Sequence, residues 1–243
     1  MKNRFIAALI GLSGLSTSWG LTTVSNFESV LRPFGLGLAV ETDCEKFFSA
    51  ANTLSGLDLY VGTAHCFREG KYTISAFLLS AGDIRLSVES EVFPVEPQDE
   101  RSLFQAISLR KQFMSELGAE SIFRSEVQFS YLYKLLSDWN PAIVASDFDS
   151  WRVQLTNKQA AVDDLNARVE RHKKIRLDML NLQRALFSSD EFYQIKMELD
   201  ALNRKMSGRF VGGSSEEQRA RELFSKLTDL SQKIAKTLPT ISK

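Results

Sequence analysis

Most of the chain has the pattern of amphipathic helices. Apolar residues recur at spacings of three and four, which brings them to one face of a helix. Two short sequences, 188–191 and 214–217, match helix-capping boxes, so a new helix is expected at each of them. The predicted helices span residues 45–55, 57–68, 72–88, 102–117, 121–136 and 151–187, followed by one from the first cap to Gly208 and one from the second cap to Pro239.

Glycine and proline interrupt this helical pattern at defined places. The sequence Glu69-Gly70-Lys71 predicts a tight turn, which would make the helices on either side an antiparallel hairpin. Residues 93–97 contain two prolines and cannot continue a helix, so they are expected to form a linker. The elements together predict an all-α fold, with N-terminal repeat-like helical hairpins followed by a long-helix antiparallel bundle or coiled coil. The apolar stripes of the last hundred residues would be satisfied equally by folding back within the chain and by pairing with another chain.

The first twenty residues have the pattern of a secretory signal peptide. Lys2 and Arg4 precede an apolar run over 5–15, and Ser18 and Gly20 occupy the −3 and −1 positions of a cleavage site. A membrane anchor would need about 20 apolar residues, and this run is shorter. We therefore expect a periplasmic or secreted protein with three regions: a signal peptide (1–20), a helical repeat-like domain (21–141) and a long-helix C-terminal domain (142–243).

Export changes the interpretation of the two cysteines. Cys44 and Cys66 are the only cysteines in the chain. In an oxidising compartment an isolated even pair most often forms a disulfide. The alternative is two independent buried thiols, which would be preferred in a cytosolic protein. We predict the disulfide, which would tie adjacent helices together.

One segment resembles a known repeat family. Residues 61–72 read Val-Gly-Thr-Ala-His-Cys-Phe-Arg-Glu-Gly-Lys-Tyr, and Ala76 and Ala81 follow them. This stretch resembles a single tetratricopeptide-like helical hairpin, in which small residues let two helices pack closely. The stretch 81–85, taken with Pro94, Asp99 and residues 103–104, is similar to uncharacterised exported bacterial all-helical proteins. Neither resemblance implies an enzymatic activity.

Composition excludes several classes of protein, and charge divides the chain. The chain has 243 residues, of which 44% are hydrophobic and 25% charged, so it is neither disordered nor collagen-like. Its formal net charge is zero, but residues 21–150 are acidic overall and residues 151–243 are basic. The two halves would complement each other, or their charges are solvated helix faces. The sharper hypothesis is a partner-binding basic band that consists of Arg168, Arg171, Lys173, Lys174 and Arg176.

The chain has few of the residues that catalytic motifs need. His65 and His172 are its only histidines, so with the cysteines bridged we expect no zinc site of the His/Cys kind and no other metal. We expect no cofactor, because the glycine-containing stretches lack the spacing of nucleotide-binding loops. The carboxylate pairs 147/149 and 163/164 keep open a carboxylate-dependent envelope hydrolase, whose two acidic groups need no motif.

The function predicted from these features is a non-enzymatic, exported protein-binding module. It would act as an adaptor or as an inhibitor that neutralises a toxin delivered to the cell envelope. A membrane-surface scaffold that uses the basic C-terminal helices is the other alternative, with anionic lipid as its partner. Nucleic acid is not expected as a partner, because the basic band lacks interleaved aromatic residues. The sequence leaves the oligomeric state open.

Overall fold

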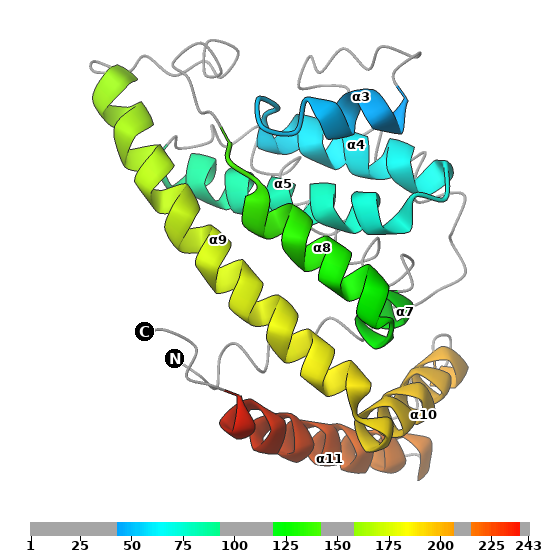
Figure 1. The fold of residues 1–243 in the computed structure, drawn as a ribbon. Coiled ribbons are helices and arrows are strands. Elements are labelled where there is room, and N and C mark those ends of the chain that lie inside the picture. The colour runs from blue at the N-terminus through cyan, green and yellow to red at the C-terminus, as the bar shows by residue number, and fades with distance from the viewer. Residues whose placement is uncertain (1–42, 93–118, 142–157, 207–214, 239–243) are drawn as a thin grey trace.

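The computed structural model describes residues 43–92, 119–141, 158–206 and 215–238, which form eight α-helices and contain no strand (Figure 1). The helices are α3 (Cys44–Ser49), α4 (Gly56–Arg68), α5 (Tyr72–Val92), α7 (Ala119–Arg124), α8 (Glu126–Asp138), α9 (Lys158–Ser188), α10 (Asp190–Met206) and α11 (Ser215–Thr237). The predicted all-α class is therefore confirmed for this part of the chain. The predicted signal peptide, the linker 93–97 and the predicted helix 102–117 lie outside the described residues, as do residues 151–157. Within the described ranges, no helix is long and apolar enough to span a membrane.

The first described helix is shorter than the periodicity predicts. Asp43 caps α3 by accepting a hydrogen bond from the backbone N–H of Lys46. The helix ends at Ser49 instead of continuing to residue 55, so the prediction was wrong at this end. Residues 50–53 form turns, and the hydroxyl of Thr53 donates to the carbonyl of Ala50. Asn, Thr and Ser side chains compete with helical hydrogen bonds in this way, which explains the early end.

Helices α4 and α5 form the hairpin that the glycine turn predicts. Gly70 has a φ of 73°, which a glycine adopts without steric cost. The N–H of Lys71 then donates to the carbonyl of Cys66 across the turn. Helix α5 continues to Val92, beyond the predicted end at residue 88. The polar residues Asp83 and Arg85 do not end α5, and both are buried.

Two glycines allow unusually close contacts in this region. A Cβ built at Gly82 of α5 would lie 2.7 Å from Cδ1 of Tyr60 in α4, and one at Gly62 would lie 2.8 Å from Cβ of Phe47 in α3. Such distances are shorter than van der Waals contact. The ring of Tyr60 has little freedom to move, because its hydroxyl donates to Asp83 over 2.6 Å and the residue is 1% exposed.

Replacing Gly82 with Ala is expected to lower the free energy of unfolding by about 1–3 kcal/mol, as in other overpacked cores. Urea denaturation monitored by circular dichroism measures this difference. Ser130→Ala provides the control, because Ser130 is exposed on α8 and surface substitutions usually change stability by less than about 0.5 kcal/mol. A Gly82→Ala protein as stable as the control would show that Tyr60 can move aside.

The single helix predicted over 121–136 is two helices in the structure. Ser125 separates α7 from α8 and caps α8, with its hydroxyl oxygen accepting from the N–H of Gln128. Helix α8 ends at Asp138, and the indole N–H of the next residue, Trp139, donates to the carbonyl of Ala51. Because Trp139 is 3% exposed, it fixes the end of α8 against the turns that follow α3.

The helices enclose two hydrophobic clusters that meet on α9. The first is built on α3 to α8 and includes Leu165, Val169 and Leu180 of α9. The second begins at Leu182 and consists of the end of α9 with α10 and α11. The change from one cluster to the other therefore falls within α9.

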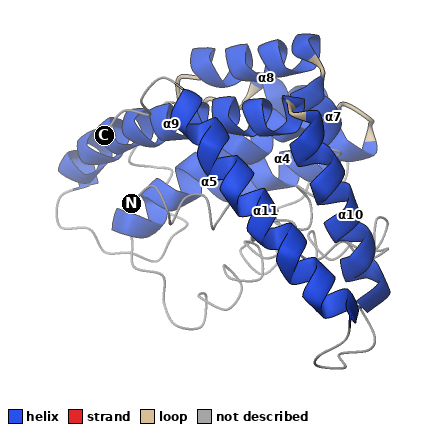
Figure 2. Ribbon diagram, turned by 90° about the horizontal axis from the view of Figure 1, so that it is seen from below, coloured by secondary structure: helices blue, strands red, loops and turns tan. Residues whose placement is uncertain are grey.

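Helices α10 and α11 lie side by side at one end of the molecule (Figure 2). Ser189 begins α10 as predicted, with its hydroxyl oxygen accepting from the N–H of Phe192. The two helices bury Leu199, Leu223 and Leu227 between them and the end of α9. The buried residues of α10 and α11 therefore pack within the chain.

Candidate functional site

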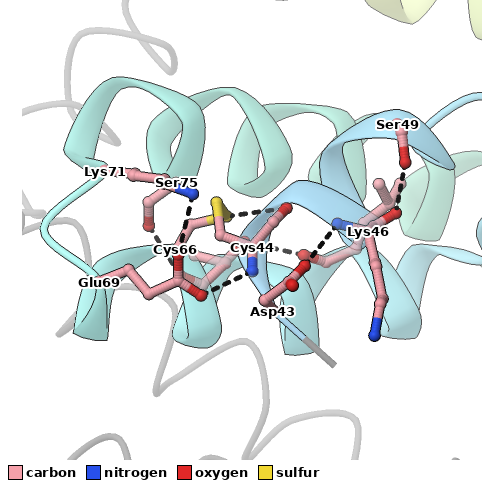
Figure 3. Close-up of a disulfide and its surroundings, with 10 residues drawn as sticks. Asp43, Cys44, Lys46, Ser49, Cys66, Glu69, Lys71 and Ser75 are labelled. Carbon is pink, nitrogen blue, oxygen red and sulfur yellow. Dashed lines mark hydrogen bonds and ion pairs between the residues drawn. A yellow bond between two sulfur atoms is a disulfide. The ribbon is translucent and has the colours of Figure 1, made fainter. Parts of the chain in front are cut away.

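A disulfide joins Cys44, at the start of α3, to Cys66 in α4, with an S–S distance of 2.03 Å (Figure 3). Both residues are fully buried. The predicted bridge is therefore present, and it ties a six-residue helix to the central hairpin. Short helices of this kind are marginal in isolation, so the bridge has a structural role.

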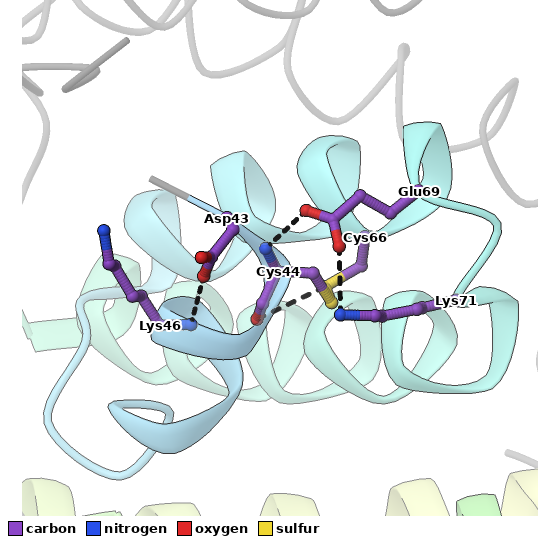
Figure 4. A network of polar contacts seen from close by, with 6 residues as sticks. All are labelled: Asp43, Cys44, Lys46, Cys66, Glu69 and Lys71. Atoms are coloured by element: carbon purple, nitrogen blue, oxygen red, sulfur yellow. Dashed lines mark hydrogen bonds and ion pairs between the residues drawn. A yellow bond between two sulfur atoms is a disulfide. The ribbon is translucent and has the colours of Figure 1, made fainter. Parts of the chain in front are cut away.

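A carboxylate reinforces the same junction (Figure 4). Oε1 of Glu69 accepts a hydrogen bond of 2.7 Å from the backbone N–H of Cys44, and Oε2 lies 3.0 Å from Nζ of Lys71. These two contacts lower the pKa of Glu69, and the hydrogen bond from Cys44 has the larger effect. Glu69 in turn raises the pKa of Lys71. The charged form of each group is thus favoured where α3 and α4 meet.

A buried polar network connects α4, α5 and α9. Oδ2 of Asp83 lies 3.0 Å from a guanidinium nitrogen of Arg176, and its Oδ1 accepts from the hydroxyl of Tyr60. Arg176 also donates to the hydroxyl of Ser80 over 3.3 Å. The side chains of Asp83 and Arg176 are 9% and 7% exposed. The network therefore holds α9 against the α4–α5 hairpin and neutralises the buried carboxylate.

The five residues of the predicted basic band differ in exposure and in their contacts. Arg176 is buried in the network, and Lys173 donates to the carbonyl of Trp139 with a side chain only 13% exposed. Arg168 forms an ion pair with Asp164, one turn earlier on α9. Arg171 and Lys174 are exposed. The five residues do not form one continuous surface, and two of them contribute to packing.

The other candidate residues from the sequence are dispersed. The ring of His65 stacks on that of Phe47 at 5.2 Å, and His172 is half-buried on α9. Asp163 and Asp164 are exposed on α9, while the pair 147/149 lies outside the described residues. The described part of the chain contains no group of three or more His, Cys, Asp or Glu residues that could hold a metal ion.

The surface of the α10–α11 hairpin combines apolar and basic side chains. Met197 on α10 is 40% exposed, and Phe224 on α11 is 46% exposed. Several more apolar residues of the hairpin are only partly buried, among them Ile195, Leu202, Leu230 and Ile234. The lysines of the second half of α11 are exposed at positions 226, 233 and 236. Lys226 and Lys233 lie two and nine positions after Phe224, which places them on the opposite side of α11 from Phe224. We call the exposed part of α10 and α11 the hairpin surface.

Comparisons with known proteins add no assignment: no protein-family model, curated protein or solved structure matches the chain.

Proposed function

We propose that the chain is an exported helical module that binds another protein, and that the hairpin surface is its binding site. The observation that carries this proposal is the incomplete burial of the α10–α11 stripe. Among the helices described, α10 and α11 pack mainly on each other and on α9. Large apolar side chains such as Phe224 remain accessible on them, and aromatic residues in such positions often dominate binding energy.

The basic side chains indicate the chemistry of the partner. Leu230 lies four residues after Lys226 and three before Lys233, so the three side chains share one side of α11. Phe224 lies on the opposite side of α11, so the complementary partner would contact both sides, with an apolar site for Phe224 and acidic residues facing the lysines. The protein would then serve as an adaptor, or as an inhibitor that covers the acidic surface of a toxin in the envelope.

In this proposal the parts of the protein built on the two hydrophobic clusters have different roles. The α3–α5 region, with its tetratricopeptide-like hairpin and disulfide, supplies a stable body for an oxidising compartment. Helices α10 and α11, which pack on each other and on the end of α9, present the hairpin surface.

The experiment is affinity capture from envelope extracts with the full-length, exported protein as bait. Replacing Phe224 with Ser is expected to weaken retention of the partner at least tenfold, which corresponds to about 1.4 kcal/mol of binding free energy. Val127→Ser is the matched control, because Val127 is an apolar residue on α8 that is 80% exposed.

Two outcomes would contradict the proposal. A partner that Val127→Ser loses and Phe224→Ser retains would place the binding site on α8. A protein that captures no stoichiometric partner at low salt would not be a binding module. Because the lysines of α11 are exposed, binding should also weaken as salt shortens the screening length from about 10 Å at 0.1 M to about 3 Å at 1 M.

A further inference from the structure

The corner between α9 and α10 determines where the hairpin surface lies. Helix α9 ends at Ser188 and α10 begins at Asp190, so Ser189 alone separates them. Ser189 contributes to both helix ends, since its N–H donates to the carbonyl of Leu186 and its hydroxyl accepts from Phe192. Leu182 and Leu186 of α9 pack in one cluster with α10 and α11, so a change of backbone angle at Ser189 would move the two helices together as far as this packing allows.

Arg124, at the end of α7, contacts this corner in three ways. One guanidinium nitrogen lies 2.9 Å from Oδ1 of Asp190, and the other donates over 3.4 Å to the carbonyl of Phe187. The guanidinium carbon also lies 4.5 Å from the centre of the Tyr193 ring. The cation therefore meets the negative C-terminal end of α9 and an acidic side chain in the first turn of α10.

The neighbouring residue makes an apolar contact with the same corner. The rings of Phe123 and Phe187 stack with centres 5.6 Å apart and planes 7° apart. Phe187 meets Phe192 of α10 edge to face, also at 5.6 Å. Phe187 packs against both hydrophobic clusters. Phe123 therefore holds the α9–α10 corner in place through its contact with Phe187.

We propose that Arg124 is a latch that fixes the angle of the α10–α11 hairpin, and that its release lets the hairpin turn about Ser189. The latch is at the surface, where Arg124 and Asp190 have side chains 39% and 84% exposed. Exposed ion pairs are weak, so an acidic partner can displace Asp190 from Arg124. The latch itself needs no partner, whereas its use in partner binding rests on the function proposed above.

The test measures the hairpin angle directly, without a partner. Spin labels on Ser130→Cys in α8 and Ser225→Cys in α11, both exposed sites, report their distance distribution by pulsed electron paramagnetic resonance. The native cysteines are bonded to each other and remain unlabelled. Replacing Arg124 with Met keeps the aliphatic part of the side chain and removes all polar contacts. We expect the distribution to become at least twice as broad while the helical content stays constant.

Two further variants make the result decisive. Asp190→Asn removes only the ion pair and should broaden the distribution less than Arg124→Met does. Glu191→Gln, at the next residue and also exposed, is the matched control and should leave the width unchanged. A wild-type width in Arg124→Met overturns the latch. Should that variant fail to fold, a wild-type width in Asp190→Asn overturns it instead. Broadening of these distributions with unchanged partner capture would support the latch and reject only its link to binding.

Discussion

Replacing Arg176 with Met is expected to lower the free energy of unfolding by about 3–5 kcal/mol. The substitution would leave the carboxylate of Asp83 in the interior without the guanidinium that lies 3.0 Å away. Tyr60 would still donate to it, but a neutral hydrogen bond does not replace the lost charge pair. The loss is measured by urea denaturation with the disulfide intact, provided that the slope of the transition stays constant.

A second variant separates two contributions to the free energy of unfolding: the penalty for an unpaired buried charge, and the net stabilisation by the Asp83–Arg176 ion pair. The double substitution Asp83→Leu/Arg176→Met replaces both charges with apolar side chains and should recover at least half of the lost stability. Recovery will be incomplete because the buried hydroxyl of Tyr60 loses its acceptor. Arg171→Met is the control for helix α9, since Arg171 is exposed. A loss below about 1 kcal/mol in Arg176→Met would show that water reaches Asp83.

The sequence predicts the local features of this fold well. Helices follow from spacings of three and four, the turn at Gly70 from its tolerance of positive φ, and the start of α10 from the capping-box sequence 188–191, although the capping hydroxyl is that of Ser189. The disulfide follows from the number of cysteines and the expected compartment. Each of these depends on residues close together in the chain or on a single pair.

The contacts between distant residues could not be predicted in the same way. The run of basic residues on α9 predicts a surface position for Arg176, but the residue is buried, and it lies seven positions after Val169 and four before Leu180, which are both buried. These spacings place Arg176 on the same face of α9 as the two buried residues, so the sequence itself indicated its burial. The identity of its partner depends on how α5 packs on α9, because Asp83 lies 93 positions earlier in the chain. The contacts of Arg124 with the α9–α10 corner likewise join residues more than 60 positions apart.

Removing the disulfide by the double substitution Cys44→Ala/Cys66→Ala is expected to lower the free energy of unfolding by about 3 kcal/mol, from the entropy of the open chain. The bridge spans 22 positions and holds the start of α3 on α4. Urea denaturation of the exported protein gives the size of the loss. Alanine suits both sites because they are fully buried and a serine hydroxyl there would need a partner.

Hydrogen exchange shows where the loss occurs. Without the bridge, Glu69 still accepts from the N–H of Cys44 and Phe47 still packs against Gly62, but a six-residue helix has little stability of its own. The amides of Ala50 and Ala51, which donate within the end of α3, should therefore lose protection through local opening, at free energies below that of global unfolding. Helices α10 and α11, in the other cluster, should lose protection only in line with the global change. Equal additional loss in α3 and α11 would contradict this assignment, because it would mean that the bridge stabilises the whole chain as one unit and has no special role in holding α3.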